Sequence, residues 1–416
     1  KYIYIKLTML YSDKRDKMKE RFEMMQKMGI NKEKVKKRME ENLVHNISQI
    51  KNLVGKNTKI CIAVKADSYG HNAILTSKIA EEIGIEYLAV ATIGEAFELR
   101  EAGIKSKILL LSLCTPEEFE DIFKLDLIPL VFTKEYIQGL SDAADKFYKN
   151  DSKKVAVHLA VDTGMGRIGC YANEAGEQAK LINSKNHLEL QGMCTHFAVS
   201  DSLTEENQIF TKNQYDNFVL AVENVKKEGI NPGICHCGSS AALLNNKEMH
   251  FDMVRPGIIT YGYYPDEITQ EYLHSKGVNI DLKPVLAFET KVVAIRHFEK
   301  GKTISYGRTY ACPEDTDIAV LPIGYADGLL RRFSPEGKVT INGKLYPICG
   351  RICMDQCMVN IGKNNPNVKL WDKVVIFGPS QSGALMTADD YAKIGNTISY
   401  EVLTSISKRV ERVVEG

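Results

Sequence analysis

Strand-like and helical segments alternate eight times between residues 60 and 260, and this alternation constrains the fold more than any other feature of the sequence. The strand-like segments are rich in Val, Ile and Leu, as is typical of strands buried on both faces of a parallel sheet. Eight β/α units predict a closed barrel that carries its functional residues at the C-terminal ends of the strands. The predicted strands are 60–65, 87–92, 107–112, 128–132, 155–162, 189–196, 234–238 and 253–260. The helices predicted between them include 72–83, 117–123, 134–148 and 205–228.

The sequence changes character after about Lys283, where short β-rich runs are broken by glycine. This pattern predicts a second, all-β domain that ends with a short helix near 387–395 and a last strand around 402–412. We therefore expect an α/β fold in which a (β/α)8 barrel is followed by a C-terminal β domain. The expected domains are 1–41, a basic helical extension, then 42–283, the barrel, and 284–416, the β domain.

The N-terminal extension predicts two helices, one from Ser12 to Gly29 and one from Asn31 to Gly55. Apolar residues recur along one face of each. Lysines and arginines fill the remaining positions, which fits either the solvated face of two packed helices or a surface for an anionic partner.

The charge balance argues against nucleic acid or an anionic membrane as a partner, because 54 basic and 53 acidic residues give a net charge of +1. A length of 416 residues predicts two domains. Ten cysteines without a C-x-x-C pair predict reduced thiols and a cytoplasmic location. No apolar run reaches the ~20 residues that a membrane-spanning helix needs.

Lys65 ends the first predicted strand, just before the turn at 67–70. An amine held at the end of a buried strand loses solvation of its charged form, so its pKa falls toward the range in which it can attack a carbonyl. On position alone, a lysine here is more often a surface residue that closes a strand. The surrounding motifs decide between these two interpretations.

The segment A-V-K-A-D-S-Y-G-H at 63–71 is followed by six further motifs in a fixed order. They are D-T-G-M-G-R-I-G at 162–169, T-H-F at 195–197, S-S-A-A at 239–242, R-P-G at 255–257, S-Y-G at 305–307 and G-R-I-C-M-D at 350–355. Together these motifs resemble those of the alanine racemases, from about Leu43 to the C-terminus.

The resemblance implies that pyridoxal 5'-phosphate (PLP) is the cofactor and that Lys65 carries it covalently. Tyr69 is expected to contact the phosphate group of PLP. Ser240 and the backbone N–H groups of Gly257 and Ile258 are expected to complete the phosphate site.

Four more barrel residues acquire roles from the resemblance. Arg167 is expected to bind the substrate carboxylate, which a planar guanidinium can do bidentately. His196 is expected to orient the catalytic tyrosine, although a histidine alone in a strand is more often a core residue. Arg255 is expected to face the pyridine nitrogen and leave it unprotonated, because a guanidinium keeps its own proton; this restrains transamination. His236 is expected to support Arg255.

The β domain contributes five candidates by the same resemblance. Tyr306 is expected to be the second base, and the Met354 backbone to lie beside the substrate carboxylate, both in the barrel of the other subunit of a homodimer. Asp355 follows in the same motif. Tyr325 and Tyr400 match positions that line the way into the site and its phosphate side. Taken singly, Tyr306 and Met354 also fit ordinary packing within their own domain.

Two other motifs predict no further site, and one position departs from the pattern of the family. The glycines at 164–169 have the spacing of a dinucleotide-binding loop but lie in the fifth β/α unit instead of the first. The segment C-H-C at 235–237 and the cysteines at 349–357 lack the spacing of a zinc site, so no metal is expected. Many family members have a lysine, often carbamylated, where this chain has Ala160, so something else must support the arginine.

These residues predict an isomerase that interconverts L-alanine and D-alanine by means of two bases, Lys65 and Tyr306 of the partner subunit. The D-alanine would serve cell-wall peptidoglycan. The nearest alternative is a serine or broader racemase, including the membrane-tethered type linked to glycopeptide resistance; the bulky ring of Tyr400 favours alanine. A PLP-binding protein without catalysis would lack the β domain, and a PLP decarboxylase would need a different lysine motif.

Overall fold

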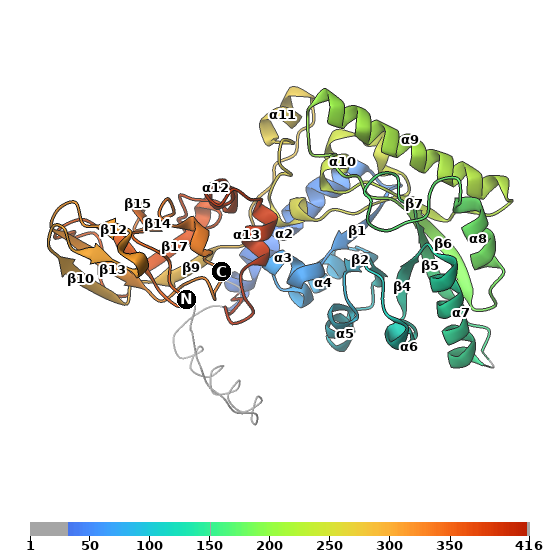
Figure 1. The fold of residues 1–416 in the computed structure, drawn as a ribbon, viewed down its shortest axis with the longest axis horizontal. Helices are drawn as coiled ribbons and strands as arrows, with labels where there is room; N and C mark the ends of the chain where they lie inside the picture. The colour runs from blue at the N-terminus through green and yellow to red at the C-terminus, as the bar shows by residue number, and fades with distance from the viewer. Residues whose placement is uncertain (1–31, 150, 414–416) are drawn as a thin grey trace. The chain divides into compact units, whose positions relative to one another are not determined.

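The structure is a computed structural model that describes the backbone of residues 32–149 and 151–413, with side chains from Glu41 onward. The described residues form two compact units, one of residues 44–282 and one of residues 283–413 together with 32–43 (Figure 1). The helix predicted from Ser12 to Gly29 lies outside the described residues.

The first unit is built on eight parallel strands, as the sequence predicted. Neighbouring strands follow the order β7-β6-β5-β4-β3-β2-β1-β8, so the last strand pairs with the first. The strands are β1 (Lys59–Ala63), β2 (Tyr87–Val90), β3 (Lys107–Leu110), β4 (Leu127–Val131), β5 (Val155–Ala160), β6 (Leu188–Cys194), β7 (Ile234–His236) and β8 (Met253–Val254).

The barrel closes between β7 and β8 without a regular ladder of hydrogen bonds. Instead, the N–H of Asp252 donates to the carbonyl of Cys235 at 3.1 Å, and the N–H of Arg255 donates to the carbonyl of Gly238 at 2.7 Å. These two bonds involve the residues just before and just after β8, and they close the barrel at this junction. The closed-barrel prediction is therefore confirmed, with one irregular junction.

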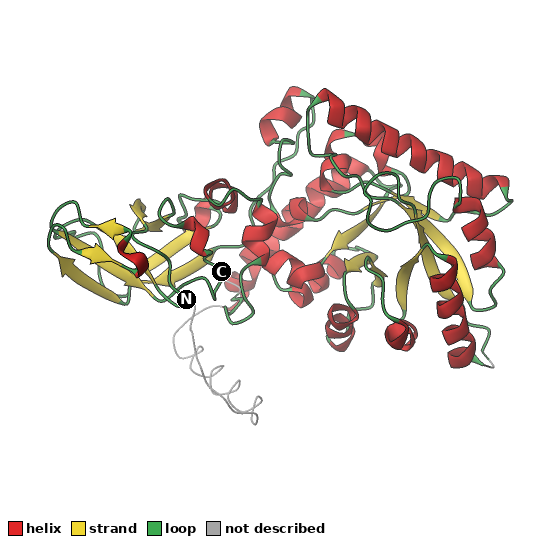
Figure 2. Ribbon diagram, viewed as in Figure 1, coloured by secondary structure: helices red, strands yellow, loops and turns green. Residues whose placement is uncertain are grey.

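Helices surround this sheet (Figure 2). They are α2 (Lys32–Val54), α3 (Lys65–Gly70), α4 (Ala73–Glu82), α5 (Ile93–Glu101), α6 (Phe119–Lys124), α7 (Lys134–Tyr148), α8 (Ala175–Asn183), α9 (Glu205–Lys227), α10 (Ser240–Asn245) and α11 (Gln270–Ser275). Threonine hydroxyls begin several of them: Thr133 caps α7, and Thr204 caps α9 by accepting from the N–H of Asn207. The predicted helix from Asn31 is present as α2.

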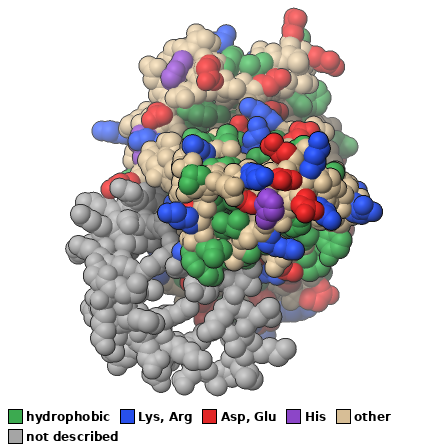
Figure 3. All heavy atoms as spheres, turned by 90° about the vertical axis from the view of Figure 1, so that its left-hand side faces the viewer, with side chains coloured by type: hydrophobic (Ala, Val, Ile, Leu, Met, Phe, Trp, Pro, Cys, Tyr) green, Lys and Arg blue, Asp and Glu red, His purple; other side chains and the backbone are tan. Residues whose placement is uncertain are grey.

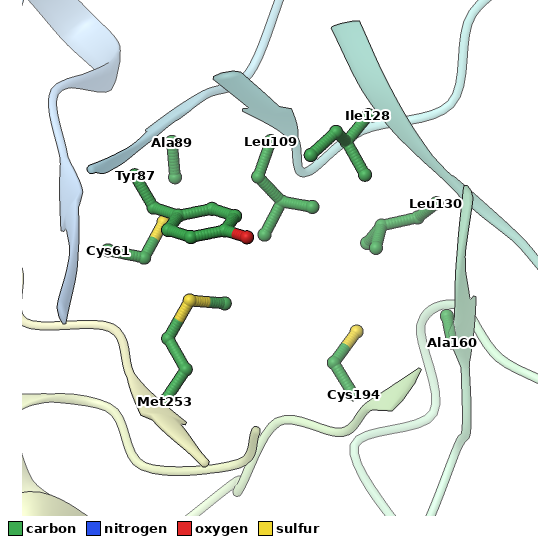
Figure 4. Packing of buried hydrophobic residues seen from close by; sticks show 9 residues of the cluster. All are labelled: Cys61, Tyr87, Ala89, Leu109, Ile128, Leu130, Ala160, Cys194 and Met253. Atoms are coloured by element: carbon green, nitrogen blue, oxygen red, sulfur yellow. The ribbon is translucent and has the colours of Figure 1, made fainter. Parts of the chain in front are cut away.

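Small and large apolar side chains fill the inside of the barrel (Figure 4). Ile128 and Leu130 of β4 both point inward because residues two apart on a strand share a face. The ring of Tyr87 reaches into the middle of the cluster. Ala160 and Cys194 supply only small side chains on the opposite wall.

The second unit consists of antiparallel sheets with two short helices. One sheet has the order β10-β13-β16 and another the order β15-β14-β17-β9, while β11 and β12 form a hairpin pair. The elements are β9 (Phe288–Lys291), β10 (Ala294–Phe298), β11 (Thr303–Ile304), β12 (Tyr310–Ala311), β13 (Thr316–Leu321), β14 (Lys338–Ile341), β15 (Lys344–Pro347), β16 (Cys357–Asn360), β17 (Lys373–Phe377), α12 (Ala388–Ile394) and α13 (Ser399–Thr404).

The strand predicted around 402–412 is wrong. Residues Ser399–Thr404 form helix α13, whose Val402 and Leu403 are buried. Beyond it, the chain is held by a side chain instead of a strand ladder: the guanidinium of Arg412 donates to the carbonyls of Ser407, Val410 and Ile406. β-Branched residues suggested a strand, but burial of one helical face decided the local structure.

In Figure 3, the face of the second unit that is turned to the viewer mixes basic and acidic side chains. Such a mixture agrees with the nearly equal numbers of basic and acidic residues in the sequence, which give a net charge of +1. Within the described part of the chain, no helix has the combination of length and apolar character that crossing a membrane requires.

Candidate functional site

Lys65 lies two residues beyond the end of β1, at the start of an unusual turn. The four residues Ala66 to Tyr69 all have left-handed backbone angles, with φ between 52° and 54°. Each such residue other than glycine costs roughly 1–2 kcal/mol, so the surrounding structure must hold the turn in place. Because strain of this kind gathers at functional sites, the turn itself marks Lys65.

Two carboxylates fix this left-handed turn. Glu95 of α5 accepts the Ala66 N–H at 2.6 Å with one oxygen and the Ala91 N–H at 2.8 Å with the other, which ties the turn to the end of β2. Asp67 accepts the N–H of Ala73, the first residue of α4, at 2.8 Å. The position of the Lys65 backbone is therefore set from both sides.

The pKa of Lys65 is lowered from its ordinary value, mainly because the amine is largely buried. The positive charges of Arg167 and Arg255 lower the pKa further, while the negative charge of Glu95 opposes them. The electrostatics thus favour an amine that gives up its proton, the state in which it is a nucleophile or a base.

Tyr69, Ser240 and Gly257 converge on one point beside this lysine. The N–H of Gly257 donates to the Ser240 hydroxyl at 2.9 Å. A side chain at Gly257 would place its Cβ only 2.6 Å from the Tyr69 hydroxyl, so only glycine fits there. Burial raises the pKa of Tyr69 to about 12, which keeps the phenol protonated as a donor. Ile258 follows as the first residue of a short 3-10 helix.

These groups suit an anion such as the phosphate of PLP. Two hydroxyls and a backbone N–H stand together where a Cβ would fill the space. Hydroxyl and N–H donors of this kind bind phosphate oxygens.

Arg255 is buried and held by several hydrogen bonds. Its Nη1 donates to Nδ1 of His236 at 2.6 Å and to the carbonyl of His236 at 2.8 Å, and its Nη2 donates to the carbonyl of Thr195 at 2.7 Å. Its Nε–H makes no hydrogen bond to another residue that the structure describes. The guanidinium is therefore fixed in orientation and keeps a donor for a ligand.

His158 extends this arrangement, and sequence reasoning missed it. Its Nδ1 lies 2.8 Å from Nε2 of His236, and both rings are fully buried. Burial and the charge of Arg255 lower the pKa of His158 to about 3 and that of His236 well below its usual range. One signal could have revealed His158: it stands two residues before Ala160, hence on the same inward face of β5.

His196 follows β6 by two residues and is close to the same charges. Burial lowers its pKa to about 3, and the charges of Arg255, Arg167 and Lys65 add to the effect. Its carbonyl accepts from the Gln214 amide at 3.3 Å. The ring is thus neutral across the physiological range, and a neutral ring can accept as well as donate a hydrogen bond.

The glycine-rich motif before Arg167 serves a compact loop. Asp162 accepts the N–H groups of Gly164 and Gly166 at 2.9 and 3.1 Å. A Cβ at Gly169 would lie 2.2 Å from the Asp162 nitrogen, so this glycine permits two backbone segments to approach each other. The glycines are therefore explained by the loop itself and need no dinucleotide.

The zinc interpretation of segment 235–237 conflicts with the bonds of His236. Its two ring nitrogens contact Arg255 and His158, which leaves no lone pair free for a metal. Across residues 32–149 and 151–413, no group of three or more His, Cys, Asp or Glu side chains is arranged to hold a metal ion.

Two candidates of the second unit, Tyr325 and Met354, lie on loops that are joined by backbone hydrogen bonds. The N–H of Tyr325 donates to the carbonyl of Cys353, and the N–H of Ala326 donates to the carbonyl of Met354, each at 3.0 Å. Tyr306 is 68% exposed and Met354 52% exposed. Ordinary packing within their own unit therefore does not explain these two side chains.

Arg409 connects these two loops to the C-terminal segment. Its Nε donates to the buried carboxylate of Asp327 at 2.8 Å, and its Nη2 donates to Asp355 at 2.7 Å. Asp327 also accepts the N–H of Gly324 at 2.9 Å. Tyr400 lies nearby in sequence, as the second residue of α13.

Sequence profiles of two alanine racemase domains match this chain, the N-terminal domain over residues 40–265 and the C-terminal domain over residues 285–414. The chain belongs to the alanine racemase family. The alanine racemase of Treponema denticola is 48% identical over 375 residues, which are 90% of this chain and 96% of that protein.

Solved alanine racemases have the same fold. The alanine racemase of Clostridium difficile 630 superposes with a TM-score of 0.80 at 38% identity, over 89% of this chain and 92% of that one. The alanine racemase of Bacillus anthracis, solved with bound L-Ala-P, superposes with a TM-score of 0.79 at 35% identity, over 88% and 91% of the two chains.

Ala160, at the end of β5, lies two residues before Asp162 of the glycine-rich loop. Ala160 is buried among the apolar side chains of the barrel and brings no charge or hydrogen-bonding side chain toward Arg167. Arg167 makes no side-chain hydrogen bond to another residue in the described part of the barrel. After burial, the positive charge of Arg167 contributes to the lowered pKa values of Lys65 and His196.

Proposed function

We propose that this protein interconverts L-alanine and D-alanine with PLP as its cofactor. The observation that carries the proposal is a partly buried lysine of lowered pKa, in a chain of the alanine racemase family whose Tyr69, Ser240 and Gly257 form a site suited to an anion. Lys65 would hold the cofactor, and Tyr69, Ser240 and the Gly257 and Ile258 backbone would hold its phosphate. Bound there, PLP withdraws electrons from the amino acid and makes its Cα proton acidic.

Two arginines would orient the reactants. Arg167 would bind the substrate carboxylate, as its charge beside Lys65 allows. Arg255 would present its Nε–H to the ring nitrogen. Because a guanidinium does not release its proton, the ring nitrogen stays unprotonated, and the return of a proton to Cα is favoured over transamination.

We further propose that two bases act from opposite faces of Cα. Lys65 would move the proton on one face, and Tyr306 of the partner subunit the proton on the other. The exposure of Tyr306 and Met354 in the single chain supports a homodimer in which these residues reach the partner's barrel. His196 would orient the tyrosine, and Asp355 and Tyr325 would hold the loop that carries Met354.

Enantiomer assays test the activity directly. Purified protein with PLP should convert L-alanine to D-alanine and the reverse, measured by chiral chromatography, and should convert serine and a basic amino acid more slowly. Borohydride should then fix the cofactor on the peptide that contains Lys65. Labelling of a different lysine, or conversion of serine ahead of alanine, would reject the assignment.

Tyr400 is proposed to restrict the substrate to alanine, because its ring leaves little room for a hydroxymethyl group. Tyr400→Asn should raise serine turnover relative to alanine turnover. Equal ratios in wild type and variant would show that another residue limits the pocket.

Isotope exchange tests the two bases separately. In deuterated water, Tyr306→Phe should still exchange the Cα proton of D-alanine through Lys65, while exchange from L-alanine falls by about a hundredfold or more. Equal slowing of both enantiomers would contradict the assignment of the faces.

Subunit mixing tests the shared site. Inactive Lys65→Ala and inactive Tyr306→Ala should regain activity together if hybrid dimers contain one intact site. Subunit exchange without activity would contradict sharing. We place the activity in the cytoplasm, where D-alanine would supply peptidoglycan synthesis.

A further inference from the structure

Three buried groups form a chain that leads away from the proposed cofactor ring. Arg255 Nη1 lies 2.6 Å from Nδ1 of His236, and Nε2 of His236 lies 2.8 Å from Nδ1 of His158. Both histidines are completely buried. The chain ends at Nε2 of His158, which has no hydrogen-bond partner among the described residues.

While Arg255 contacts His236, the guanidinium sets the direction of the hydrogen bonds in this chain. A guanidinium only donates, so Nδ1 of His236 must accept and carry no proton. His236 is neutral, because burial and the charge of Arg255 hold its pKa well below the usual range. Its proton is therefore on Nε2 and is donated to His158, whose own proton is then on its Nε2.

We propose that His158 is a positioning residue: by accepting from His236, it locks the histidine tautomer that holds the guanidinium of Arg255 toward the cofactor ring nitrogen. This role rests on the proposed PLP chemistry. His158 touches neither substrate nor cofactor and acts through His236 alone.

The backbone around His158 is adapted to this side chain. The pairing of β5 with β6 shifts register between Val157 and His158, and a bulge of this kind re-aims a side chain. Gly192, opposite on β6, makes room: a Cβ there would lie 2.7 Å from the His158 ring and 2.6 Å from the carbonyl of Ile234.

The unpartnered end of the chain argues against a mere filling role. A buried N–H without an acceptor lowers stability, and an apolar side chain of similar size would fill the space without that penalty. The useful group of His158 is then the acceptor Nδ1. An asparagine at this position could offer its amide oxygen near the same place, whereas a leucine could not.

The test compares His158→Asn and His158→Leu in the PLP-bound enzyme. The control is His187→Leu, which removes a histidine next to the start of β6, at the other end of the strand from the site. Nitrogen NMR of labelled histidines should show Nδ1 of His236 unprotonated and Nε2 protonated in wild type and in His158→Asn. In His158→Leu the buried Nε2–H of His236 has no acceptor, so the ring can give up its contact with Arg255 and take the other tautomer; the two signals should then move toward an average of tautomers.

The second measurement is the ratio of transamination to racemisation. We expect His158→Leu to raise this ratio by roughly tenfold, the change that about one pKa unit at the ring nitrogen would produce. His158→Asn and His187→Leu should stay near the wild-type ratio.

The inference is overturned if His158→Leu matches His187→Leu in both measurements, or if His158→Asn loses as much as His158→Leu. If His158→Leu does not fold, wild type still decides: a protonated Nδ1 on His236 would reverse the chain and end the proposal. Absence of racemisation in wild type would instead reject the proposed function, while the tautomer spectrum would still report on His158.

Discussion

Mild acid should destabilise this protein steeply, because three histidines, two fully buried and one partly buried, are held in their neutral form. Burial lowers the pKa of His158 and His196 to about 3, and that of His236 falls well below its usual range. In the unfolded chain each titrates near its ordinary pKa of about 6.5. Below pH 6.5 the unfolded state therefore binds more protons than the folded state, and stability falls as the pH falls toward about 3.

The expected loss follows from the proton balance. Between pH 7 and pH 5.5, each histidine that stays neutral in the folded state costs about 1.2 kcal/mol, so the three together cost about 4 kcal/mol. Above pH 7 the three histidines are mostly neutral in the unfolded chain as well, so they change the free energy of unfolding little with pH. A loss of this size is a large fraction of the 5–15 kcal/mol that typically stabilises a folded protein.

Urea unfolding at pH 7.0, 6.25 and 5.5, followed by circular dichroism, measures this loss. His158→Asn removes one of the three proton sites and should reduce the loss by about a third. His297→Gln changes an exposed histidine that pairs with Asp317 on the surface and should leave the loss near the wild-type value. A free energy of unfolding that is unchanged between pH 7 and pH 5.5 would show that these rings are not held neutral.

Further changes test the loops around the site. Gly257→Ala should weaken PLP binding by about tenfold in a fluorescence titration, since its Cβ would lie 2.6 Å from the Tyr69 hydroxyl. The control Gly94→Ala, whose Cβ would meet no atom closer than 3.9 Å, should bind PLP normally in the same titration. Glu95→Gln should lower the pKa of Lys65 further, because a neighbouring negative charge is lost; in cofactor-free protein, the midpoint of Lys65 labelling with an amine reagent should move to lower pH, and a rise would contradict this. Arg409→Met should lower Tm by about 5 °C, because a buried aspartate loses its charged partner, and an unchanged melting curve would show that the pair contributes nothing.

Much of the barrel was predictable because strands buried on both faces must be apolar runs. All eight predicted strands are present, and their starts agree with the structure to within a residue. Their ends agree less well: the strand predicted at 253–260 stops at Val254. Ile258 and Ile259 are buried in a short helix instead, and burial alone does not distinguish the two structures.

Residues of the candidate site could be found in the sequence only where they belong to motifs of consecutive residues. Lys65 could be found from its motif, but the left-handed turn that follows it depends on Glu95, which lies 29 residues beyond Ala66. His158 has no motif of its own, and its importance comes from His236, 78 residues away. Contacts of this range follow from barrel closure and not from any local pattern.

The closure of the barrel also determines when, during synthesis of the chain, the surroundings of Lys65 are completed. The N–H of Ala63 bonds to the carbonyl of Pro256, and the carbonyl of Ala63 accepts from the Tyr261 hydroxyl at 2.7 Å. Both partners leave the ribosome about 190 residues after Lys65, a delay of roughly 10–40 s at ordinary rates of translation. Until then the first strand has an unpaired edge, which a chaperone or another nascent chain can occupy. The surroundings of the lysine that opens the sequence of motifs are thus completed only by residues that are made long after it.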